Sequence, residues 1–298
     1  VGYNPETGRP KRKYFYGRTR KEVQEKVNKA ALEVQAGTYR EPTEMTVAEW
    51  FTTWMDNYMK HSLRPTTWES HKYQVDGHII PALGHLRLAQ LQTAHIQRLY
   101  NDKLQGGRLD GKPGGLSPKS IRYIQTVIHS CLEQARKEGM VTINPASAVR
   151  LPKLEQPEIK YLSAAEVATF LTHAKESKHF TAFLLALNTG MRRGEVLALR
   201  WQDIDFKAGH LTVNQGLVRI TGKGLVFQEP KTKLSNRIVG LAPALVQALK
   251  EHKKQQNETR LLAGSAYNSK LDLVFANELG EPMCPQAFAK AFGRLVKK

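Results

Sequence analysis

The sequence predicts a multidomain chain: a small α+β module over residues 1–42, an all-α domain over 43–150, a linker over 151–160 and a mixed α+β domain over 161–298. Its 298 residues exceed the usual size of a single domain. The segment INPASAVRLPKLEQPEIKY contains three prolines and little hydrophobic periodicity, which is typical of a linker. Helical periodicity dominates before this segment, whereas short alternating runs follow Asp205.

The first module is expected to combine a strand or hairpin with one helix. Residues 4–8 have the composition of a turn, and KRKYFYG alternates basic and aromatic residues as a strand does. Thr19 and Glu22 form a capping box that predicts the start of the helix. The sequence begins at Val1 rather than at a methionine, and we expect the first strand to be incomplete.

The all-α domain is expected to contain four helices. Thr46 and Glu49 form a capping box that predicts the start of the first helix. Aromatic side chains recur along this helix at helical spacing, and we interpret them as core rather than as a platform on which bases stack. A glycine-rich loop, GGRLDGKPGGLSP, precedes the last helix. The first predicted helix starts at Thr46 and the second runs from about Thr66 to Ile79. The third runs from a cap at Thr93 to about Leu104, and the fourth runs from Pro118 to Glu138.

The mixed domain is expected to follow the order helix, small antiparallel sheet, helix. Ser163 and Glu166 form a capping box, and the helical run is predicted to continue through Leu187. Beyond Asp205 the predicted elements are strands around LTVNQGLVRI, GLVFQE and NRIVGL, a helix near Pro243–Lys254, a strand LVFA and a final helix from about Pro285.

The chain has a formal net charge of +18, and basic residues outnumber acidic ones in each of the segments 1–42, 43–152 and 153–298. An excess spread along a folded chain indicates contact with a polyanion. Nucleic acid is favoured over a membrane surface, because no strongly basic amphipathic helix with a broad apolar face stands out. No apolar run could span a bilayer, and Cys131 and Cys284 fit neither a disulfide framework nor a zinc pattern, so we expect a cytoplasmic protein.

Two adjacent arginines occupy an unusual place in the segment NTGMRRGEVLALRWQDID. Arg192 and Arg193 lie at the start of an expected helix, where positive charge opposes the helix dipole at a cost of about a few tenths of a kcal/mol. An ordinary surface helix is one explanation, and a bound phosphate, which guanidinium contacts with a planar fork, is the other. Successive helical residues diverge by about 100°, so one arginine would face the phosphate. Glu195, on the same face as Arg192, could hold its side chain.

TGMRRGEVLALRWQDID, residues 189–205, resembles the first arginine box of the tyrosine recombinase, or phage integrase, family. EPKTKLSNRIVGL resembles the β-hairpin lysine segment of that family, which places the catalytic lysine at Lys231. HIIPALG and INPASAV resemble recurrent segments of the core-binding domain and of its exit. GYNPETGRPKRKYFYGRTRKE resembles the arm-type-site domain of integrases from temperate phages and conjugative transposons. The resemblance spans nearly the whole chain and is most specific in the arginine box.

The resemblance implies three domains: an arm-type-site DNA-binding domain, a SAM-like core-binding domain and a catalytic domain. It implies that DNA is cleaved and rejoined through a 3′-phosphotyrosyl intermediate, without a metal or another cofactor. Arg192 would stabilise charge on the phosphate, Lys231 would protonate the leaving oxygen, and Glu195 would support Arg192. The expected DNA-contact residues are Arg193, Lys72, Lys119, Arg122, Arg12, Lys13, Lys233 and Arg237.

The same resemblance implies the partners. Double-stranded DNA would be bound at core-type and arm-type attachment sites of a mobile element, by a homotetramer. An excisionase or a host DNA-bending protein would be a further partner, and no membrane is involved. The expected location is the nucleoid of a bacterial cell.

Part of the family pattern is not found downstream of the lysine segment. The family requires an H-x-x-R box and a tyrosine nucleophile there, but His210 and His252 are followed by LTV and KKQ. Tyr267, in GSAYNSK, comes before the place of the missing box and is interpreted as an ordinary loop residue. HSLR at 61–64 and HIQR at 95–98 spell the box in the wrong domain and are interpreted as structural.

The sequence therefore resembles a catalytic domain truncated before its second arginine box, and we expect this chain to be inactive by itself. One alternative function is that of a truncated or degenerate integrase that only binds attachment-site DNA. A more distant alternative is an RNA-binding or ribosomal protein explained by charge alone. The arginine box together with Lys231 argues against the distant alternative, because passive binding needs neither.

Overall fold

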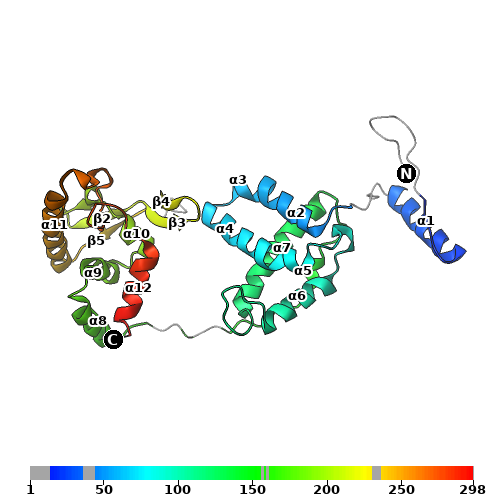
Figure 1. The fold of residues 1–298 in the computed structure, drawn as a ribbon, viewed down its shortest axis with the longest axis horizontal. Helices are drawn as coiled ribbons and strands as arrows, with labels where there is room; N and C mark the ends of the chain where they lie inside the picture. Colours follow the sequence, from blue (N-terminus) through cyan, green and yellow to red (C-terminus); the bar gives the residue numbers. More distant parts are fainter. Residues whose placement is uncertain (1–13, 36–43, 156–157, 159–160, 230–235, 298) are drawn as a thin grey trace. The chain divides into compact units, whose positions relative to one another are not determined.

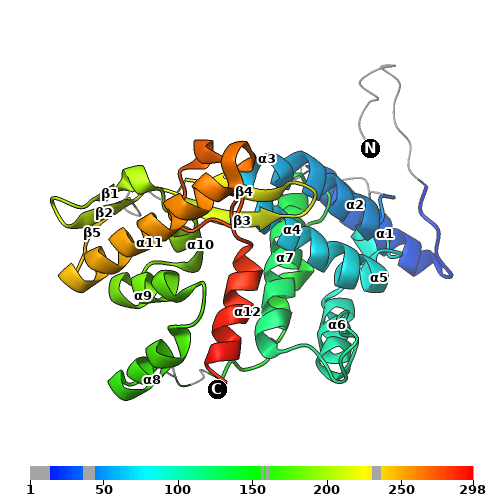
Figure 2. The same cartoon turned by 60° about the vertical axis from the view of Figure 1, so that its left-hand side comes forward.

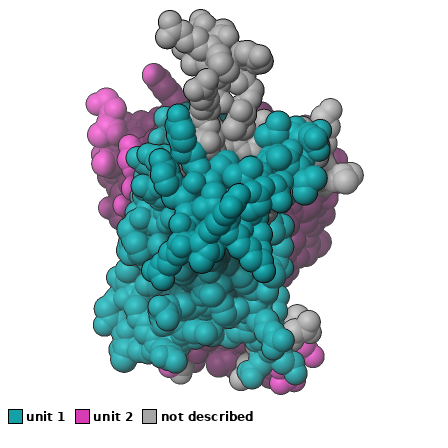
Figure 3. Space-filling model, turned by 90° about the vertical axis from the view of Figure 1, so that its right-hand side faces the viewer, with its two compact units in different colours: residues 1–156 teal, residues 157–298 magenta. Residues whose placement is uncertain are grey.

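The computed structural model describes residues 14–35, 44–155, 158, 161–229 and 236–297 (Figure 1). The chain forms two compact units, residues 1–156 and 157–298, which are coloured separately in Figure 3. The boundary between them falls inside the segment predicted as a linker. Within the described ranges, no helix is both long and apolar enough to cross a membrane.

Helix α1 (Arg20–Gln35) starts where the capping box predicts, because the hydroxyl of Thr19 accepts a hydrogen bond from the Glu22 amide at 3.2 Å. Several of its apolar side chains are exposed to solvent, with Val27 39% and Val34 43% exposed. The predicted strand KRKYFYG is wrong for its described residues, because residues 14–17 belong to no strand. A strand needs a hydrogen-bonded neighbour, and the alternation of Tyr14 and Tyr16 alone does not supply one. Residues 11–13 lie outside the described ranges.

The rest of the first unit is a helical bundle. Helices α2, η1 and α3 follow one another without a break, as do α4, η2 and α5, so residues 44–155 contain the four long helical runs that were predicted. The elements are α2 (Val47–Trp54), η1 (Met55–Met59), α3 (Lys60–Ser62), α4 (Pro65–Gln74), η2 (Val75–Ile79), α5 (Ile80–Leu83), η3 (Leu88–Gln90), α6 (Thr93–Gln105), α7 (Pro118–Lys137) and η4 (Pro145–Ala148).

Two details of these helices differ from the prediction. The second run does not stop at about Ile79, because the π-helical turn η2 widens the helix there and Pro81 occupies the first turn of α5, where proline is tolerated. Gly84 ends the run by donating to the Ile80 carbonyl at 2.8 Å. Thr93 is not a cap but the first residue of α6, and its hydroxyl donates to the carbonyl of Pro145 at 2.9 Å.

Aromatic side chains of α2 form the centre of this bundle, which confirms their interpretation as core. Trp50, Phe51 and Trp54 are at most 1% exposed. The indole of Trp50 donates to the carbonyl of Cys131 at 3.1 Å and so ties α2 to α7. These rings cannot stack on bases, because their faces are covered by the bundle itself.

The chain leaves the bundle along a segment that is fastened to it, which we name the exit strap (residues 144–152). Asn144 is buried and donates to the carbonyl of His129 at 3.1 Å. The amide of Gln97 bonds the backbone N–H and C=O of Arg150, at 2.8 and 3.2 Å. Arg122 donates from Nε and Nη2 to the carbonyl of Pro152, at 3.2 and 3.0 Å. Residues 151 and 152, predicted as linker, therefore contact the bundle.

The second unit contains helices around two small antiparallel sheets (Figure 2). One sheet has the strand order β1-β2-β5, with Leu211 opposite Val239, and the other is the β3–β4 hairpin. The elements are α8 (Ala164–Ala174), α9 (Phe180–Thr189), α10 (Arg193–Ala198), η5 (Trp201–Asp203), β1 (Ile204–Asp205), β2 (His210–Val213), β3 (Gly216–Ile220), β4 (Gly224–Gln228), β5 (Arg237–Gly240), α11 (Pro243–Ala263), η7 (Gly264–Ala266), η8 (Ser269–Leu271) and α12 (Pro285–Leu295).

Three predictions for this unit need correction. The helical run through Leu187 is two helices, because the polar segment 175–179 turns and Ser177 accepts a hydrogen bond from the His179 amide at 3.2 Å. The single predicted sheet is divided into two. Within the described part of the chain, the predicted strand LVFA makes isolated bridges, from Leu273 to Arg200 and from Ala276 to Pro282, and no described strand runs alongside it.

Candidate functional site

The position of Arg192 is set by the turn between α9 and α10. Gly190 adopts the left-handed conformation, with φ 62°, and its N–H bonds the Ala186 carbonyl, so α9 ends there. A residue with a side chain is rarely stable at such an angle, which accounts for the glycine of the TGMRR motif. Met191 is buried, and Arg192, the cap of α10, follows it with its side chain 76% exposed. The turn thus anchors one residue and presents the next to solvent.

Glu195 fixes Arg192 in two ways. One carboxylate oxygen accepts the backbone N–H of Arg192 at 2.8 Å, and the other accepts from its guanidinium Nη1 at 2.9 Å. The first contact occupies an amide at the start of α10 that has no partner within the helix. The second is the contact between positions i and i+3 on which the sequence interpretation of Glu195 depends.

Arg237, the first residue of β5, lies outside the sequence motif and binds the same carboxylate. Its Nη2 and Nη1 donate to the two oxygens of Glu195 at 2.7 and 3.3 Å. Burial raises the pKa of the Glu195 carboxyl, but the hydrogen bonds from Arg237 and Arg192 outweigh burial and lower that pKa to about 2. One ionised carboxylate therefore stands between two arginines, and the cluster keeps an excess of one positive charge.

Gly194 allows α10 to approach strand β3. A Cβ atom at this position would lie 2.8 Å from the carbonyl oxygen of Leu217, closer than real Cβ atoms come. The glycine of the motif is therefore required by packing between two backbones, not by a turn. This contact holds the first turn of α10, and with it Glu195, against the hairpin.

The second half of the motif is structural. Arg200 forms a fork on Asp203, with Nε and Nη2 each 2.9 Å from a carboxylate oxygen, and Asn214 donates to the same carboxylate at 2.8 Å. Trp201 donates to Gln256 of α11 at 2.6 Å. These bonds fix the chain that follows α10. Sequence reasoning did not single out Arg200, although the i, i+3 spacing of its partner was a signal.

The structure brings together only part of the predicted residue set. Arg192, Glu195 and Arg237 form one cluster, and Arg193 is exposed beside it. In the first unit, Lys119 is exposed on the first turn of α7, whereas Lys72 binds Asp76 at 2.9 Å and Arg122 binds the exit strap. The predicted residues outside the described ranges are Arg12, Lys13, Lys231 and Lys233.

Other residues weighed in the sequence occupy structural positions. Tyr267 is half-buried after η7 and lies against Gly280, and burial raises the pKa of its hydroxyl. His95 accepts the Gln92 amide at 3.2 Å where α6 begins. Across the described ranges, no group of His, Cys, Asp and Glu side chains could hold a metal ion.

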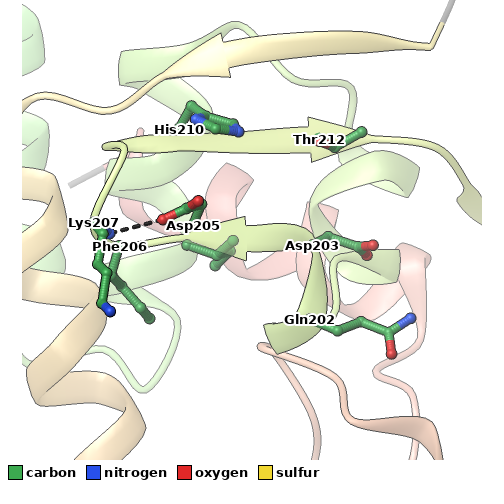
Figure 4. A pocket seen from close by; sticks show the side chains of 8 residues that line it. Gln202, Asp203, Asp205, Phe206, Lys207, His210 and Thr212 are labelled. Atoms are coloured by element: carbon green, nitrogen blue, oxygen red, sulfur yellow. Dashed lines mark hydrogen bonds between the residues drawn. The ribbon is translucent and has the colours of Figure 1, made fainter.

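A shallow pocket lies on the turn between β1 and β2 (Figure 4). Asp205 in this pocket accepts the backbone N–H groups of Lys207 and Ala208 at 2.8 and 2.9 Å, which closes the turn. The pocket contains none of the predicted site residues. Its lining consists of Gln202, Asp203, Ile204, Asp205, Phe206, Lys207, His210 and Thr212.

Each of the two units contains a segment that matches a known protein family. Residues 160–298 match the phage integrase family, and residues 46–104 match the SAM-like N-terminal domain of phage integrases. The chain belongs to the phage integrase family of tyrosine recombinases. This integrase is 29% identical to a tyrosine recombinase XerC-like protein of Caldanaerobacter subterraneus subsp. tengcongensis, over 98% of the chain and 77% of the relative. It is 27% identical to the ICEBs1 integrase of Bacillus subtilis, over 86% of the chain and 68% of the relative.

Solved integrase structures share the fold. The Tn1549 transposon integrase, solved in complex with a circular intermediate DNA, superposes with a TM-score of 0.69 at 21% identity, over 85% of this chain and 78% of the other. A lambda integrase tetramer bound to a Holliday junction gives a TM-score of 0.60 at 20% identity, over 99% of this chain and 77% of the other. The predicted multidomain fold, with a SAM-like helical domain and an α+β integrase domain, is confirmed.

The close approach at Gly194 gives a stability prediction. Replacing Gly194 with Ala forces α10 away from Leu217, and we expect the free energy of unfolding of the second unit to fall by about 1–3 kcal/mol, the usual cost of overpacking. Scanning calorimetry measures this change. Gly293→Ala in α12 is the matched control, because nothing lies within 4 Å of its added Cβ, and it should be neutral or stabilising. Equal stability of the two variants would contradict the packing role of Gly194.

Proposed function

We propose that the protein is a site-specific DNA recombinase, an integrase of a mobile element, that acts through a 3′-phosphotyrosyl intermediate. The observation that carries this proposal is the cluster of Arg192, Glu195 and Arg237, which we name the arginine site. Arg192 is exposed, is anchored at its backbone and at one guanidinium nitrogen by Glu195, and belongs to a cluster with excess positive charge. These are the properties required of a group that binds a phosphate whose negative charge grows during reaction.

The chemistry needs a cation at the non-bridging oxygens and a proton donor at the leaving oxygen. Arg192 supplies the first with a planar guanidinium, which binds two phosphate oxygens at once. Lys231 is proposed as the proton donor to the 5′-oxygen only because its segment, EPKTKLSNRIVGL, resembles the lysine segment of the family. Because Glu195 is already ionised and shared, it orients Arg192 without cancelling the charge of the whole cluster.

The proposed partner is duplex DNA at attachment sites, contacted by basic residues of both units. Lys119 and Arg193 are exposed and can meet backbone phosphates. Lys72, Arg122 and Arg237 already have protein partners, so any phosphate contact would use their remaining donors. We extend the proposal to a homotetramer on DNA, to an excisionase or host DNA-bending protein as further partners, and to action at the bacterial nucleoid.

We propose further that these 298 residues alone bind DNA without becoming covalently attached to it. The intermediate requires a tyrosine close to the phosphate. Tyr267 is half-buried against Gly280, and its neighbour Asn268 is held by a bond to Glu281 at 3.0 Å, so this segment is fixed by its own contacts. The arginine site can then hold a phosphate without a nucleophile to attack it.

Binding to duplex DNA should be steeply salt-dependent, because each displaced phosphate counterion contributes to the slope. For a mixed-sequence duplex of about 30 base pairs, we expect the affinity to fall by on the order of 10³ between about 50 and 200 mM KCl. Fluorescence anisotropy at a series of salt concentrations measures the slope. An affinity that does not change with salt would contradict a phosphate-dominated interface.

Arg192→Ala should leave the affinity for duplex DNA within a few-fold of the parent value. A group that acts on the charge developed in the transition state contributes little to binding of the unreacted phosphate. Anisotropy with the same duplex measures this, and Arg193→Ala is the matched neighbour of equal charge. A loss on the order of a hundredfold, about 2.7 kcal/mol, would instead make Arg192 a simple phosphate clamp.

The chain should form no covalent adduct with a nicked duplex that traps the intermediate. Denaturing electrophoresis with end-labelled DNA measures the adduct, and a recombinase with a known nucleophile serves as the positive control for the trap. A shifted band that Tyr267→Phe abolishes would show that Tyr267 is the nucleophile and that the proposal of a non-covalent complex is wrong.

A further inference from the structure

Three side chains of the arginine site differ sharply in exposure. Glu195 is 11% exposed, Arg237 31% and Arg192 76%. The carboxylate is thus covered, one arginine lies mostly inside the protein, and the other reaches solvent. An anion arriving from solvent meets Arg192 first.

Glu195 divides its hydrogen bonds unequally between the two guanidinium groups. Arg237 binds both oxygens with two nitrogens, in the fork geometry that gives the strongest arginine–carboxylate contact. Arg192 gives only Nη1 to one oxygen. A guanidinium has five N–H donors, so most donors of Arg192 lie outside this contact.

Removing Arg237 would change this division. The Glu195 carboxylate would keep its place, because the Arg192 backbone N–H holds it at 2.8 Å, but one face of the carboxylate would lose its cation. A mostly buried carboxylate without that cation would attract the nearest remaining guanidinium, which is that of Arg192. A closed fork between Arg192 and Glu195 would then neutralise the exposed charge and use two of its donors.

We propose that Arg237 is a positioning residue that occupies both oxygens of Glu195 and thereby keeps the charge and the free donors of Arg192 available for a DNA phosphate. It acts through Glu195, because both of its terminal nitrogens donate to that carboxylate and its side chain is only 31% exposed. The phosphate as target rests on the proposed function. The competition between two arginines for one carboxylate rests only on the hydrogen bonds from Arg192 and Arg237 to Glu195.

The availability of Arg192 can be measured by its reaction with phenylglyoxal, which modifies guanidinium groups, followed by mass spectrometry of the peptides. Two arginines of the same unit are internal references. Arg200 is closed in a fork on Asp203, and Arg193 is exposed. In the parent protein Arg192 should react at a rate close to that of Arg193. In Arg237→Ala its rate should fall several-fold, toward that of Arg200.

Charge compensation separates this role from a merely structural one. In the double variant Glu195→Gln/Arg237→Ala the rate of Arg192 should return to the parent value, because the carboxylate charge that captures Arg192 is gone. Loss of a structural link between β5 and α10 would not be restored by removing its second partner. Glu195→Gln alone should leave the rate unchanged, and Arg237→Lys should keep most of it.

Three results would overturn the proposal: an unchanged rate in Arg237→Ala, no recovery in the double variant, or a several-fold rise in Glu195→Gln alone. If Arg237→Ala does not fold, which fast modification of Arg200 would reveal, Arg237→Gln takes its place with the same expectation. Adding duplex DNA tests the proposed function separately. If bound DNA does not protect Arg192 in the parent protein, the phosphate role fails while the competition for Glu195 still stands.

Discussion

The arginine site depends on one carboxylate, that of Glu195, shared between two arginines that are far apart in the sequence. A single arginine on a carboxylate would be a neutral pair, and a lone exposed arginine would have no fixed orientation. With two arginines on one carboxylate, the side chain of Arg192 is held at one nitrogen while the cluster remains cationic. The strongly lowered pKa of Glu195 follows from the same arrangement.

The backbone around this carboxylate is shaped by two glycines with different functions. Gly190 supplies a left-handed residue that ends α9 and turns the chain, and Gly194 removes the Cβ atom that would collide with Leu217. Arg192 lies between these two glycines. At both positions a residue with a side chain would be strained, at Gly190 by its backbone angle and at Gly194 by the contact with Leu217. A short helix such as α10 could not keep a charged cap in place by its own stability, so the support comes from tertiary packing.

Features that depend on local chemistry could be predicted from the sequence. The capping boxes at Thr46 and Ser163, the helix from Pro118 and the buried face of α2 follow from residue spacing within one element. The break between α8 and α9, the π-helical turn before Pro81 and the division of the strands into two sheets depend on contacts between elements, which periodicity does not contain. The same holds at the site. The i, i+3 spacing pointed to Glu195 beside Arg192, but its contact with Arg237 joins residues 42 positions apart.

The exit strap has a consequence for the connection between the two units. Since Gln97 and Arg122 fasten the chain as far as Pro152, the connection from the fastened segment to the second unit starts at Lys153 and not at Leu151. Residues 153–160, fully extended, reach at most about 29 Å. Substitution of Arg122 would release residues 151 and 152, and substitution of Gln97 in addition would release Arg150, so the connection would lengthen by two to three residues, about 7–11 Å of extended chain.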